Sequence, residues 1–350
     1  MSESNPIRIA IVGIGRAGWG MHTKELASRD DTFKIVACCE PIEERRKMMA
    51  EKYGCKTYDD FDEMLKDDDV ELVDIASPSA FHTPQAILAL EAGKIVFLEK
   101  PIAVSHDEAK QLMAVAEKHP GKLFIRHNRR EEPTFQHIRE IISSGILGEV
   151  YEIKLRRGGY QRRGDWQTVK EKRGGQLLNW GPHIIDHALR FVDGKVNSVW
   201  SDLRRIACLG DAEDHVHIII KGGDNDRVVD LEISGGAAIK EPTYLVYGTR
   251  GALTSDERTI KMKYLDPDVQ LADLKADPGT PPVGGSFGSK EQLAWIEKEI
   301  DVAPSTKCQG VHIWDHLYET IRNDKPFIIE LSEALQVMEI ISKAREGTEF

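Results

Sequence analysis

Apolar and polar residues follow two different rhythms along the chain, and the first rhythm covers roughly the first 126 residues. Short runs of apolar, β-prone residues are separated by stretches with helical periodicity. The predicted strands cover residues 7–12, 33–39, 56–58, 70–75, 95–98 and 123–126, and the predicted helices cover about 19–28, 42–52, 60–66, 85–92 and 106–118. Strands that alternate with helices indicate a parallel, doubly wound sheet of the Rossmann type, whose ligands bind beyond the carboxyl ends of the strands.

The second rhythm begins near residue 131, where the helices no longer separate most of the strands. Two helices, 134–144 and 177–192, flank a strand over 150–157. The later predicted strands cover 196–206, 215–221, 227–234, 243–248, 252–255 and 259–265. Residues 265–290 are rich in Pro, Gly and Asp and predict a surface loop, and helices over 311–322 and 332–345 follow. This pattern predicts an α+β domain with a large, mostly antiparallel open sheet.

The length of the chain supports this division. Its 350 residues exceed what one hydrophobic core usually supports. We therefore predict two domains, residues 1–128 and residues 129–350.

The first predicted strand runs directly into a glycine-rich turn with the spacing G-x-G-x-x-G. In a strand–turn–helix unit, the first glycine allows a tight turn, the second lets the backbone approach a pyrophosphate, and the third allows close packing. The helix that follows presents free N–H groups to the phosphates. Turns of this kind bind NAD, FAD and other adenosine ligands. The residues predicted to hold the dinucleotide here are Gly13, Ile14, Gly15, Arg16, Ala17 and Gly18.

The residue that ends the second predicted strand bears on the choice of nucleotide. Glu40 lies 22 positions after Gly18, where an acidic side chain accepts hydrogen bonds from the ribose hydroxyls and repels a 2′-phosphate. NAD is therefore favoured over NADP. Arg45 and Arg46 follow closely and partly offset the repulsion, so use of NADP stays open. The alternative is that Glu40 merely starts the next helix.

Two more polar segments follow strand ends of the first domain. Ser77-Pro78-Ser79, with His82 shortly after it, follows the fourth strand, and Glu99-Lys100-Pro101 follows the fifth. Because the carboxyl ends of parallel strands meet at one edge of the sheet, we expect both segments beside the glycine turn. Ser77, Pro78, His82, Glu99 and Lys100 therefore join the predicted cofactor site, together with Glu40 and Arg45.

Glu99-Lys100-Pro101 resembles the E-K-P motif of the Gfo/Idh/MocA oxidoreductases. The stretch from Gly174 to Asp186 is similar to the family signature G-G-x-x-x-D-x-G-x-H-x-x-D, except that Asn179 stands at the position of the first aspartate. Residues 128–130, 144–150 and 246–251 also resemble the family. The resemblance implies that Lys100 and His183 form the acid/base pair beside a nicotinamide, and that the peptide before Pro101 is cis. It also implies a homo-oligomer, a dimer or tetramer, formed through the open sheet.

This pair suits the oxidation of a secondary alcohol. A histidine accepts the hydroxyl proton near neutral pH, while a lysine ammonium stabilises the developing alkoxide and lowers the pKa of the histidine. Asn179 orients its neighbours by hydrogen bonds but adds no negative field, which predicts a weaker base at His183. The alternatives are an exposed loop lysine at Lys100 and a structural histidine at His183.

His183, Asp186 and His187 share one helix face and could hold a metal ion, but no cysteine or acidic cluster completes the set. We therefore predict no metal site. His187 is interpreted as a packing or supporting residue.

Basic residues gather in the segment that is predicted to flank the cleft. Residues 122–173 contain 13 Lys and Arg against 7 Asp and Glu, which predicts an anionic or highly hydroxylated substrate. A solvated or inter-subunit face is the alternative for any one of these arginines. Trp166 has an aromatic ring that could stack on a sugar. The predicted substrate neighbours are Lys100, Asn128, Arg130, Trp166, Asn179, His183 and Asp186.

Charge and composition restrict the partners and the compartment. With 47 Lys and Arg against 58 Asp and Glu, the net charge is −11, which argues against nucleic acid or an anionic membrane surface as the partner. No apolar run reaches the length of a membrane span, and the N-terminus has no basic, apolar leader. Five cysteines without a C-x-x-C pair are typical of buried thiols in a reducing compartment, so we expect a cytoplasmic protein.

Together these features predict an NAD-dependent oxidoreductase that transfers a hydride between the nicotinamide and a secondary alcohol of a sugar, polyol or sugar derivative. One alternative is a glycoside-cleaving enzyme that keeps NAD bound and oxidises its substrate only transiently. Another is a nucleotide-sensing regulator without catalysis. The regulator is the weakest of the three because both Lys100 and His183 are present.

Overall fold

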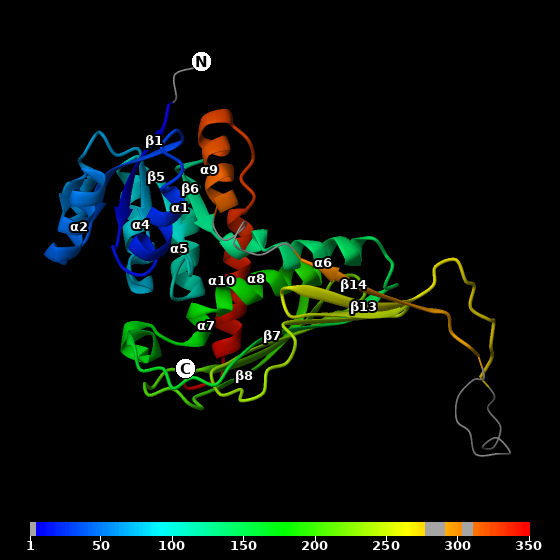
Figure 1. The fold of residues 1–350 in the computed structure, drawn as a ribbon. Coiled ribbons are helices and arrows are strands. Elements are labelled where there is room, and N and C mark those ends of the chain that lie inside the picture. The colour runs from blue at the N-terminus through cyan, green and yellow to red at the C-terminus, as the bar shows by residue number, and fades with distance from the viewer. Residues whose placement is uncertain (1–4, 277–290, 303–310) are drawn as a thin grey trace.

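The computed structural model describes residues 5–276, 291–302 and 311–350 of the chain. Two sheets dominate it, a smaller one near the N-terminus and a larger one below it that projects to one side (Figure 1). The first sheet has the strand order β3-β2-β1-β4-β5-β6, and all its pairs are parallel. Its strands are β1 (Ile7–Val12), β2 (Phe33–Cys39), β3 (Lys56–Tyr58), β4 (Leu72–Ile75), β5 (Ile95–Glu99) and β6 (Leu123–Arg126).

This sheet confirms the predicted doubly wound architecture. The strand order reverses between β1 and β4, and this switch point is where such sheets bind their ligands. The helices between the strands are α1 (Thr23–Leu26), α2 (Glu43–Tyr53), α3 (Phe61–Leu65), α4 (His82–Glu91) and α5 (His106–Ala116). The helix predicted over 19–28 is instead a π-helical turn, η1 (Gly18–His22), followed by the short α1. Ser105 caps α5 by accepting a hydrogen bond from the Glu108 N–H at 3.2 Å.

The second sheet has eight strands in the order β14-β13-β12-β11-β7-β10-β9-β8. All its pairs are antiparallel except β7 with β10, which confirms the mostly antiparallel prediction. Its strands are β7 (Val150–Gly158), β8 (Val196–Arg204), β9 (His215–Gly222), β10 (Arg227–Ser234), β11 (Tyr244–Gly248), β12 (Gly251–Ser255), β13 (Thr259–Leu265) and β14 (Trp295–Asp301).

Strand β14 was not predicted from the sequence. It pairs with β13 at the edge of the sheet, where its charged side chains remain exposed. Its two inward apolar residues, Ile296 and Ile300, are four positions apart, a spacing that does not show the strict alternation of a strand. Of the predicted loop over 265–290, residues 266–276 form irregular structure, and 277–290 lie outside the described residues.

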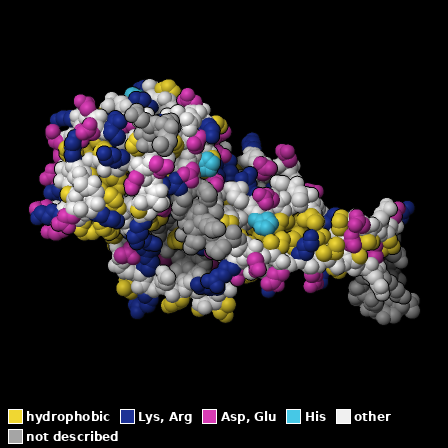
Figure 2. Space-filling model, turned by 45° about the horizontal axis from the view of Figure 1, so that its top comes forward, with side chains coloured by type: hydrophobic (Ala, Val, Ile, Leu, Met, Phe, Trp, Pro, Cys, Tyr) yellow, Lys and Arg dark blue, Asp and Glu magenta, His cyan; other side chains and the backbone are white. Residues whose placement is uncertain are grey.

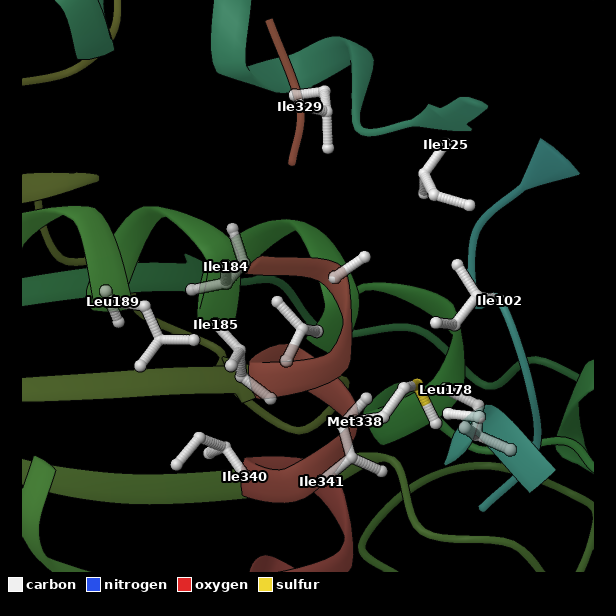
Figure 3. Packing of buried hydrophobic residues seen from close by; sticks show 14 of the residues in the cluster. Ile102, Ile125, Leu178, Ile184, Ile185, Leu189, Ile329, Met338, Ile340 and Ile341 are labelled. Carbon is white, nitrogen blue, oxygen red and sulfur yellow. The ribbon is translucent and has the colours of Figure 1, made fainter. Parts of the chain in front are cut away.

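Helices cover one face of this larger sheet. They are α6 (Pro133–Ser143), α7 (Gln176–Asn179), α8 (Gly181–Val192) and α10 (Leu331–Arg345). The helix predicted over 177–192 is broken at Trp180, because Pro182 starts a new helix at α8. Helix α10 lies between the two sheets (Figure 1). In Figure 3, Met338 and Ile341 of α10 lie near Ile185 of α8 and Leu178 of α7, within one buried apolar cluster that joins both parts of the chain.

The last part of the chain also returns to the first sheet. Helix α9 (Val311–Asn323) places the buried Trp314 ring 4.8 Å from Phe97 and 5.4 Å from Phe33. The first sheet therefore uses residues from the far end of the chain, which the linear division at residue 128 does not describe. That boundary stays a prediction.

The surface carries both signs of charge. Figure 2 shows basic and acidic side chains interspersed over the visible face, and apolar side chains along the projecting part of the larger sheet. None of the helices in the described ranges is long and apolar enough to cross a bilayer.

Candidate active site

The glycine turn after β1 has the geometry that a dinucleotide requires. Gly13 has a φ of +87°, and a Cβ there would lie 2.6 Å from the Ser77 Cα. A Cβ at Gly18 would lie 2.1 Å from the Gly13 carbonyl oxygen, whereas a Cβ at Gly15 would meet no atom within 4 Å. Packing within the protein thus demands the first and third glycines, and the second faces open space. The residues present fit a bound pyrophosphate at this turn.

Glu40 joins the end of β2 to this turn. Its Oε2 accepts a hydrogen bond from the Ile14 N–H at 2.7 Å, and its Oε1 lies 3.4 Å from Arg45 Nη1. Arg46 instead donates to the backbone carbonyl of Glu40 at 2.7 Å. The Glu40 carboxylate therefore lies at the turn itself, with α2 beginning only at Glu43. Of the two nearby arginines, Arg45 is the one that contacts this carboxylate.

The loops after β4 and β5 are joined by His82. Its Nδ1 lies 2.6 Å from the Pro101 carbonyl oxygen, and its Nε2 lies 2.8 Å from the Ser77 carbonyl oxygen. The Ser77 hydroxyl donates to Gln85 at 2.6 Å, and Pro78 leads into a short turn over Ser79–Phe81. Both ring nitrogens of His82 face protein carbonyls. In this geometry His82 therefore holds together the two loops at the edge of the sheet where the cofactor is predicted to bind. Its predicted contact with the cofactor stays a prediction.

Lys100 connects this edge to the second domain. The Lys100–Pro101 peptide is cis, as the resemblance implied. Lys100 Nζ donates a hydrogen bond to the backbone carbonyl of Asn179 at 2.8 Å, across 79 positions of sequence. Burial, reinforced by Arg129 and Arg126, lowers the pKa of Lys100 to about 8, although Glu99 opposes the shift. Lys100 is therefore a half-buried, positioned ammonium rather than an exposed loop lysine.

A buried network of charges lies beneath Lys100. Glu99 Oε2 accepts a hydrogen bond from the Lys100 N–H at 3.0 Å, and its Oε1 accepts one from Arg126 at 2.6 Å. Arg126 also contacts Glu25 at 2.6 Å, and Glu25 accepts a further hydrogen bond from the Trp314 indole at 2.8 Å. The backbone of Lys100 is thus tied to α9 through Glu99, Arg126 and Glu25.

His22 completes this network from the π-helical turn η1. Its Nδ1 lies 2.7 Å from Asp74 and its Nε2 lies 3.0 Å from Glu99. Burial opposes protonation of His22, but Asp74 and the two hydrogen bonds outweigh it and raise its pKa to about 9. The sequence analysis missed His22 and Asp74, and it interpreted Arg126 as one of the arginines that flank the cleft, whereas the side chain pairs with Glu99 and Glu25. One signal was available, because Asp74 is a charged residue inside a strand that is buried along its whole length.

His183 lies at the start of α8 and is 7% exposed. Burial, followed by the charges of Lys100 and Arg129, lowers its pKa well below 6.5, so the imidazole is neutral at physiological pH. Its Nδ1 is buried and finds no hydrogen-bond partner within the described parts of the chain. Lys100 thus depresses the pKa of His183 in the direction that the sequence predicted.

Trp180 is a residue that the sequence analysis did not select. Two guanidinium groups hold its ring, with Arg129 4.4 Å and Arg157 4.6 Å from the ring centroid, and this centroid lies 6.0 Å from that of His183. Trp180 lies between Asn179 and α8 in the chain. The clamp of Arg129 and Arg157 on Trp180 therefore fixes the turn in which the Asn179 carbonyl accepts the hydrogen bond from Lys100.

Two of the predicted substrate neighbours are engaged with each other. Arg130 Nε donates to Asp186 at 3.0 Å, and the same guanidinium contacts Glu333 of α10. His187 stacks on Phe135 with centroids 3.9 Å apart, in agreement with its interpretation as a packing residue. In this geometry Arg130 and Asp186 therefore pair with each other inside the protein. Of the three side chains considered as metal ligands, Asp186 thus contacts Arg130 and His187 stacks on Phe135.

The other two predicted substrate neighbours lie in different surroundings. Asn128 is buried at the start of the short turn Asn128–Glu131. Trp166 is 46% exposed, and no ring contact or hydrogen bond among the described residues joins its side chain to Lys100 or His183. The predicted role of each in binding substrate stays a prediction.

The arginine-rich segment is largely neutralised in the folded protein. Each of its best-placed arginines faces a carboxylate, which leaves little free positive charge for an anionic substrate. The pairs are Arg126 with Glu99, Arg129 with Glu132, Arg130 with Asp186, Arg156 with Asp230, Arg157 with Glu257 and Arg163 with Asp165. This arrangement favours the hydroxylated form of the substrate hypothesis over the anionic form.

Comparison with known proteins identifies the class to which this fold and site belong. Residues 7–127 match the family model described as the oxidoreductase family with an NAD-binding Rossmann fold, and residues 135–254 match the GFO/IDH/MocA C-terminal domain. The chain belongs to the Gfo/Idh/MocA family of oxidoreductases.

Two relatives of this chain are dehydrogenases named for a sugar derivative and for a polyol. A D-glucoside 3-dehydrogenase of Escherichia coli is 33% identical over 190 residues, which span 53% of this chain and 54% of that protein. An NADP(+)-dependent scyllo-inositol 2-dehydrogenase of Bacillus subtilis is 23% identical over 98% of this chain and 94% of its own length. The crystal structure of an NAD-binding protein from Listeria innocua is 27% identical, covers 99% of this chain and 98% of its own, and superposes with a TM-score of 0.81.

Proposed function

We propose that this protein is an NAD-dependent dehydrogenase that oxidises a secondary alcohol of a neutral sugar, polyol or sugar derivative. The observation that supports this most is the contact of Lys100 Nζ with the Asn179 carbonyl, four residues before His183. It brings the lysine that follows β5 to the entrance of α8, at the same sheet edge as the glycine turn. The paired arginines support a neutral substrate. The names of a D-glucoside 3-dehydrogenase and a scyllo-inositol 2-dehydrogenase among the relatives support a hydroxylated one.

The two titratable groups have complementary tasks in such a reaction. His183 is neutral and accepts the hydroxyl proton, while the Lys100 ammonium stabilises the negative charge that develops on the oxygen. NAD, when bound, supplies the hydride acceptor. The network through Glu99 holds the Lys100 backbone, and the Arg129–Trp180–Arg157 clamp holds the turn at Asn179.

The direct test is to screen the purified full chain against a panel of sugars and polyols and follow NADH formation, with NADP in parallel. We expect at least one neutral carbohydrate to be oxidised, and we expect His183→Asn to abolish that signal. The glycoside-cleaving alternative would release a cleaved product without net NADH. A panel in which only anionic substrates react, or none does, would contradict the proposal.

The coenzyme preference gives a first specific prediction. Glu40→Gln keeps an oxygen that accepts the hydrogen bond from Ile14 but removes the negative charge, and it frees Arg45 to bind a 2′-phosphate. We expect the ratio of kcat/KM for NADP to that for NAD to rise about tenfold or more. The control is Glu43→Gln, at an exposed position of α2. An unchanged ratio would mean that Glu40 does not select the coenzyme.

Asn179 gives a second prediction, which concerns pH. Asn179→Asp adds a carboxylate to the residue whose backbone carbonyl contacts Lys100, four residues before His183, and a nearby anion favours the charged form of both. We expect both limbs of the profile of kcat/KM against pH to move to higher pH, because the pKa of His183 and that of Lys100 rise together. Asn179→Ser, which adds no charge, serves as the control. If the two variants have the same profile, the residue does not set the basicity of His183.

The proposal also covers assembly and location. The face of the second sheet that no described helix covers carries Trp200, 53% exposed, and Trp295, 44% exposed. We propose that this face joins two or four copies of the chain, which light scattering measures directly. We also propose a cytoplasmic location, because the four cysteines in the described ranges are buried free thiols.

A further inference from the structure

His22 has an unusual backbone contact in the helix that follows the glycine turn. Its N–H donates a hydrogen bond to the Ala17 carbonyl at 2.9 Å, an i→i−5 contact that belongs to the π-helical turn η1. Single π-helical turns are rare and are frequently found at functional sites. The backbone of His22 is therefore bonded directly to the turn that is predicted to hold the coenzyme.

The side chain of His22 is fully buried and contacts two neighbouring strands. Its Nδ1 lies 2.7 Å from Asp74 of β4, and its Nε2 lies 3.0 Å from Glu99 of β5. Because both ring nitrogens face carboxylate oxygens, both must carry a proton to donate, and only the imidazolium form has two N–H groups. Among the groups packed around the ring, Arg126 of β6 opposes this charge, and α9 contributes the uncharged Trp314 ring, with centroids 5.8 Å apart.

Glu99 carries this contact onward to Lys100. Its Oε1 faces both His22 and Arg126, and its Oε2 accepts the hydrogen bond from the Lys100 N–H at 3.0 Å. Two cationic donors on one oxygen fix the orientation of the carboxylate, because charge-assisted hydrogen bonds are short and strong. A continuous series of contacts therefore runs from Ala17 of the glycine turn, through His22 and Glu99, to the backbone of Lys100.

We propose that His22 is a positioning residue that joins the glycine turn to Lys100. The imidazolium holds the Glu99 carboxylate at the Lys100 N–H, so that a coenzyme at the turn and the lysine ammonium keep a fixed relation to each other. Asp74 holds His22 from the opposite side of the ring through its Oδ2. The inference rests on the function proposed above, because it takes Lys100 as the group that acts on the substrate.

Two substitutions separate the two contacts of the imidazole. In His22→Asn the amide reaches the position of Nδ1, so the contact with Asp74 is kept and the contact with Glu99 is lost. In His22→Gln the amide reaches the position of Nε2, so the contact with Glu99 is kept and the contact with Asp74 is lost. Glu99 retains Arg126 in the first variant, whereas the buried Asp74 carboxylate loses its hydrogen bond in the second. We therefore expect His22→Gln to be the less stable of the two in thermal unfolding.

The test measures Lys100 in the full chain without a substrate. Competitive labelling of lysines with acetic anhydride over a range of pH, read by mass spectrometry, gives the pH midpoint of the Lys100 amine. Burial is the largest influence on that midpoint. We expect His22→Asn to raise it by about half a pH unit or more, because a loosened lysine is better solvated. We expect the midpoint to stay unchanged in His22→Gln and in His106→Asn, a control at a half-buried histidine of α5.

The same variants give a kinetic readout once a carbohydrate substrate is known. We expect kcat to fall about tenfold in His22→Asn, because the ammonium is displaced from the reacting oxygen, and to change little in His22→Gln. NAD should still bind to both variants, since the hydrogen bond from the backbone of residue 22 to Ala17 does not depend on the side chain.

A purely structural role for His22 would give the opposite order, because the less stable His22→Gln would then show the larger shift. That order, equal shifts in the two variants, or failure of His22→Asn to fold would each overturn the inference. If only His22→Gln fails to fold, His22→Asn is compared with His106→Asn, and equal midpoints count against the inference. If the midpoint moves as expected but no carbohydrate reduces NAD, the positioning of Lys100 holds and the dehydrogenase proposal fails.

Discussion

Replacing Lys100 with methionine is expected to lower kcat for alcohol oxidation by roughly a thousandfold. The methionine side chain has similar length but carries no charge, so it removes the ammonium that stabilises the developing alkoxide. It also removes the hydrogen bond to the Asn179 carbonyl at 2.8 Å. The glycine turn is unaffected, so NAD should still bind. Steady-state kinetics with saturating sugar and a separate measurement of NAD binding give the two values.

The pH dependence distinguishes a lost ammonium from general damage to the site. The pKa of Lys100 is about 8, so the ammonium is present below that pH and is lost above it. His183, with a pKa well below 6.5, stays neutral throughout this range. Wild-type kcat should therefore fall as the pH rises through about 8, and this limb should be absent from the methionine variant. Lys118→Met, on the surface at the end of α5, is the control. A fall in kcat of less than tenfold would contradict the assigned role.

Replacing Arg126 with methionine is expected to lower the free energy of unfolding by about 3–5 kcal/mol, because it leaves two buried carboxylates without their shared cation. Arg126 contacts Glu99 and Glu25, both at 2.6 Å, and is almost completely buried. The exposed pair of Arg8 with Glu71, 3.9 Å apart, is the control, and Arg8→Met should cost less than about 1 kcal/mol. Urea unfolding of both variants at neutral pH measures the difference.

The pH dependence of this loss follows from Glu99. Desolvation would raise its pKa, but Arg126 and His22 outweigh burial and hold the pKa far below the ordinary value. The stabilisation is therefore complete above the ordinary pKa of a glutamate and is lost as the pH falls toward the folded value. The difference between wild type and Arg126→Met should shrink in acid. Adding Glu99→Gln should recover part of the loss. If Arg126→Met costs no more than Arg8→Met, the network does not stabilise the fold.

Much of the architecture is visible in the sequence, because the signals for it are local. Apart from the short, exposed β3, the strands of the first sheet are mostly apolar runs, as expected for strands buried on both faces. All six strands are found within two residues of their predicted bounds. The glycine turn is likewise a local signal, because the spacing of Gly13, Gly15 and Gly18 alone predicts a dinucleotide site. Strand β14 was missed because it is an edge strand in which Lys298 stands between the two inward residues Ile296 and Ile300 and interrupts the alternation.

What the tertiary structure alone decided is the pairing of residues far apart in the chain. Lys100 meets Asn179 across 79 positions, His22 meets Glu99 across 77, and Trp314 meets Glu25 across 289. The arginine cluster looked like an anion site in the sequence because a linear pattern does not show which carboxylates face it. Periodicity shows which residues are apolar and which are polar relative to their neighbours in sequence. It therefore predicts the helices, the strands, the sheet edges at which strands end, and the motifs. Partner choice, burial of charge and the shape of a cavity depend on how those elements pack, and only the folded chain decides them.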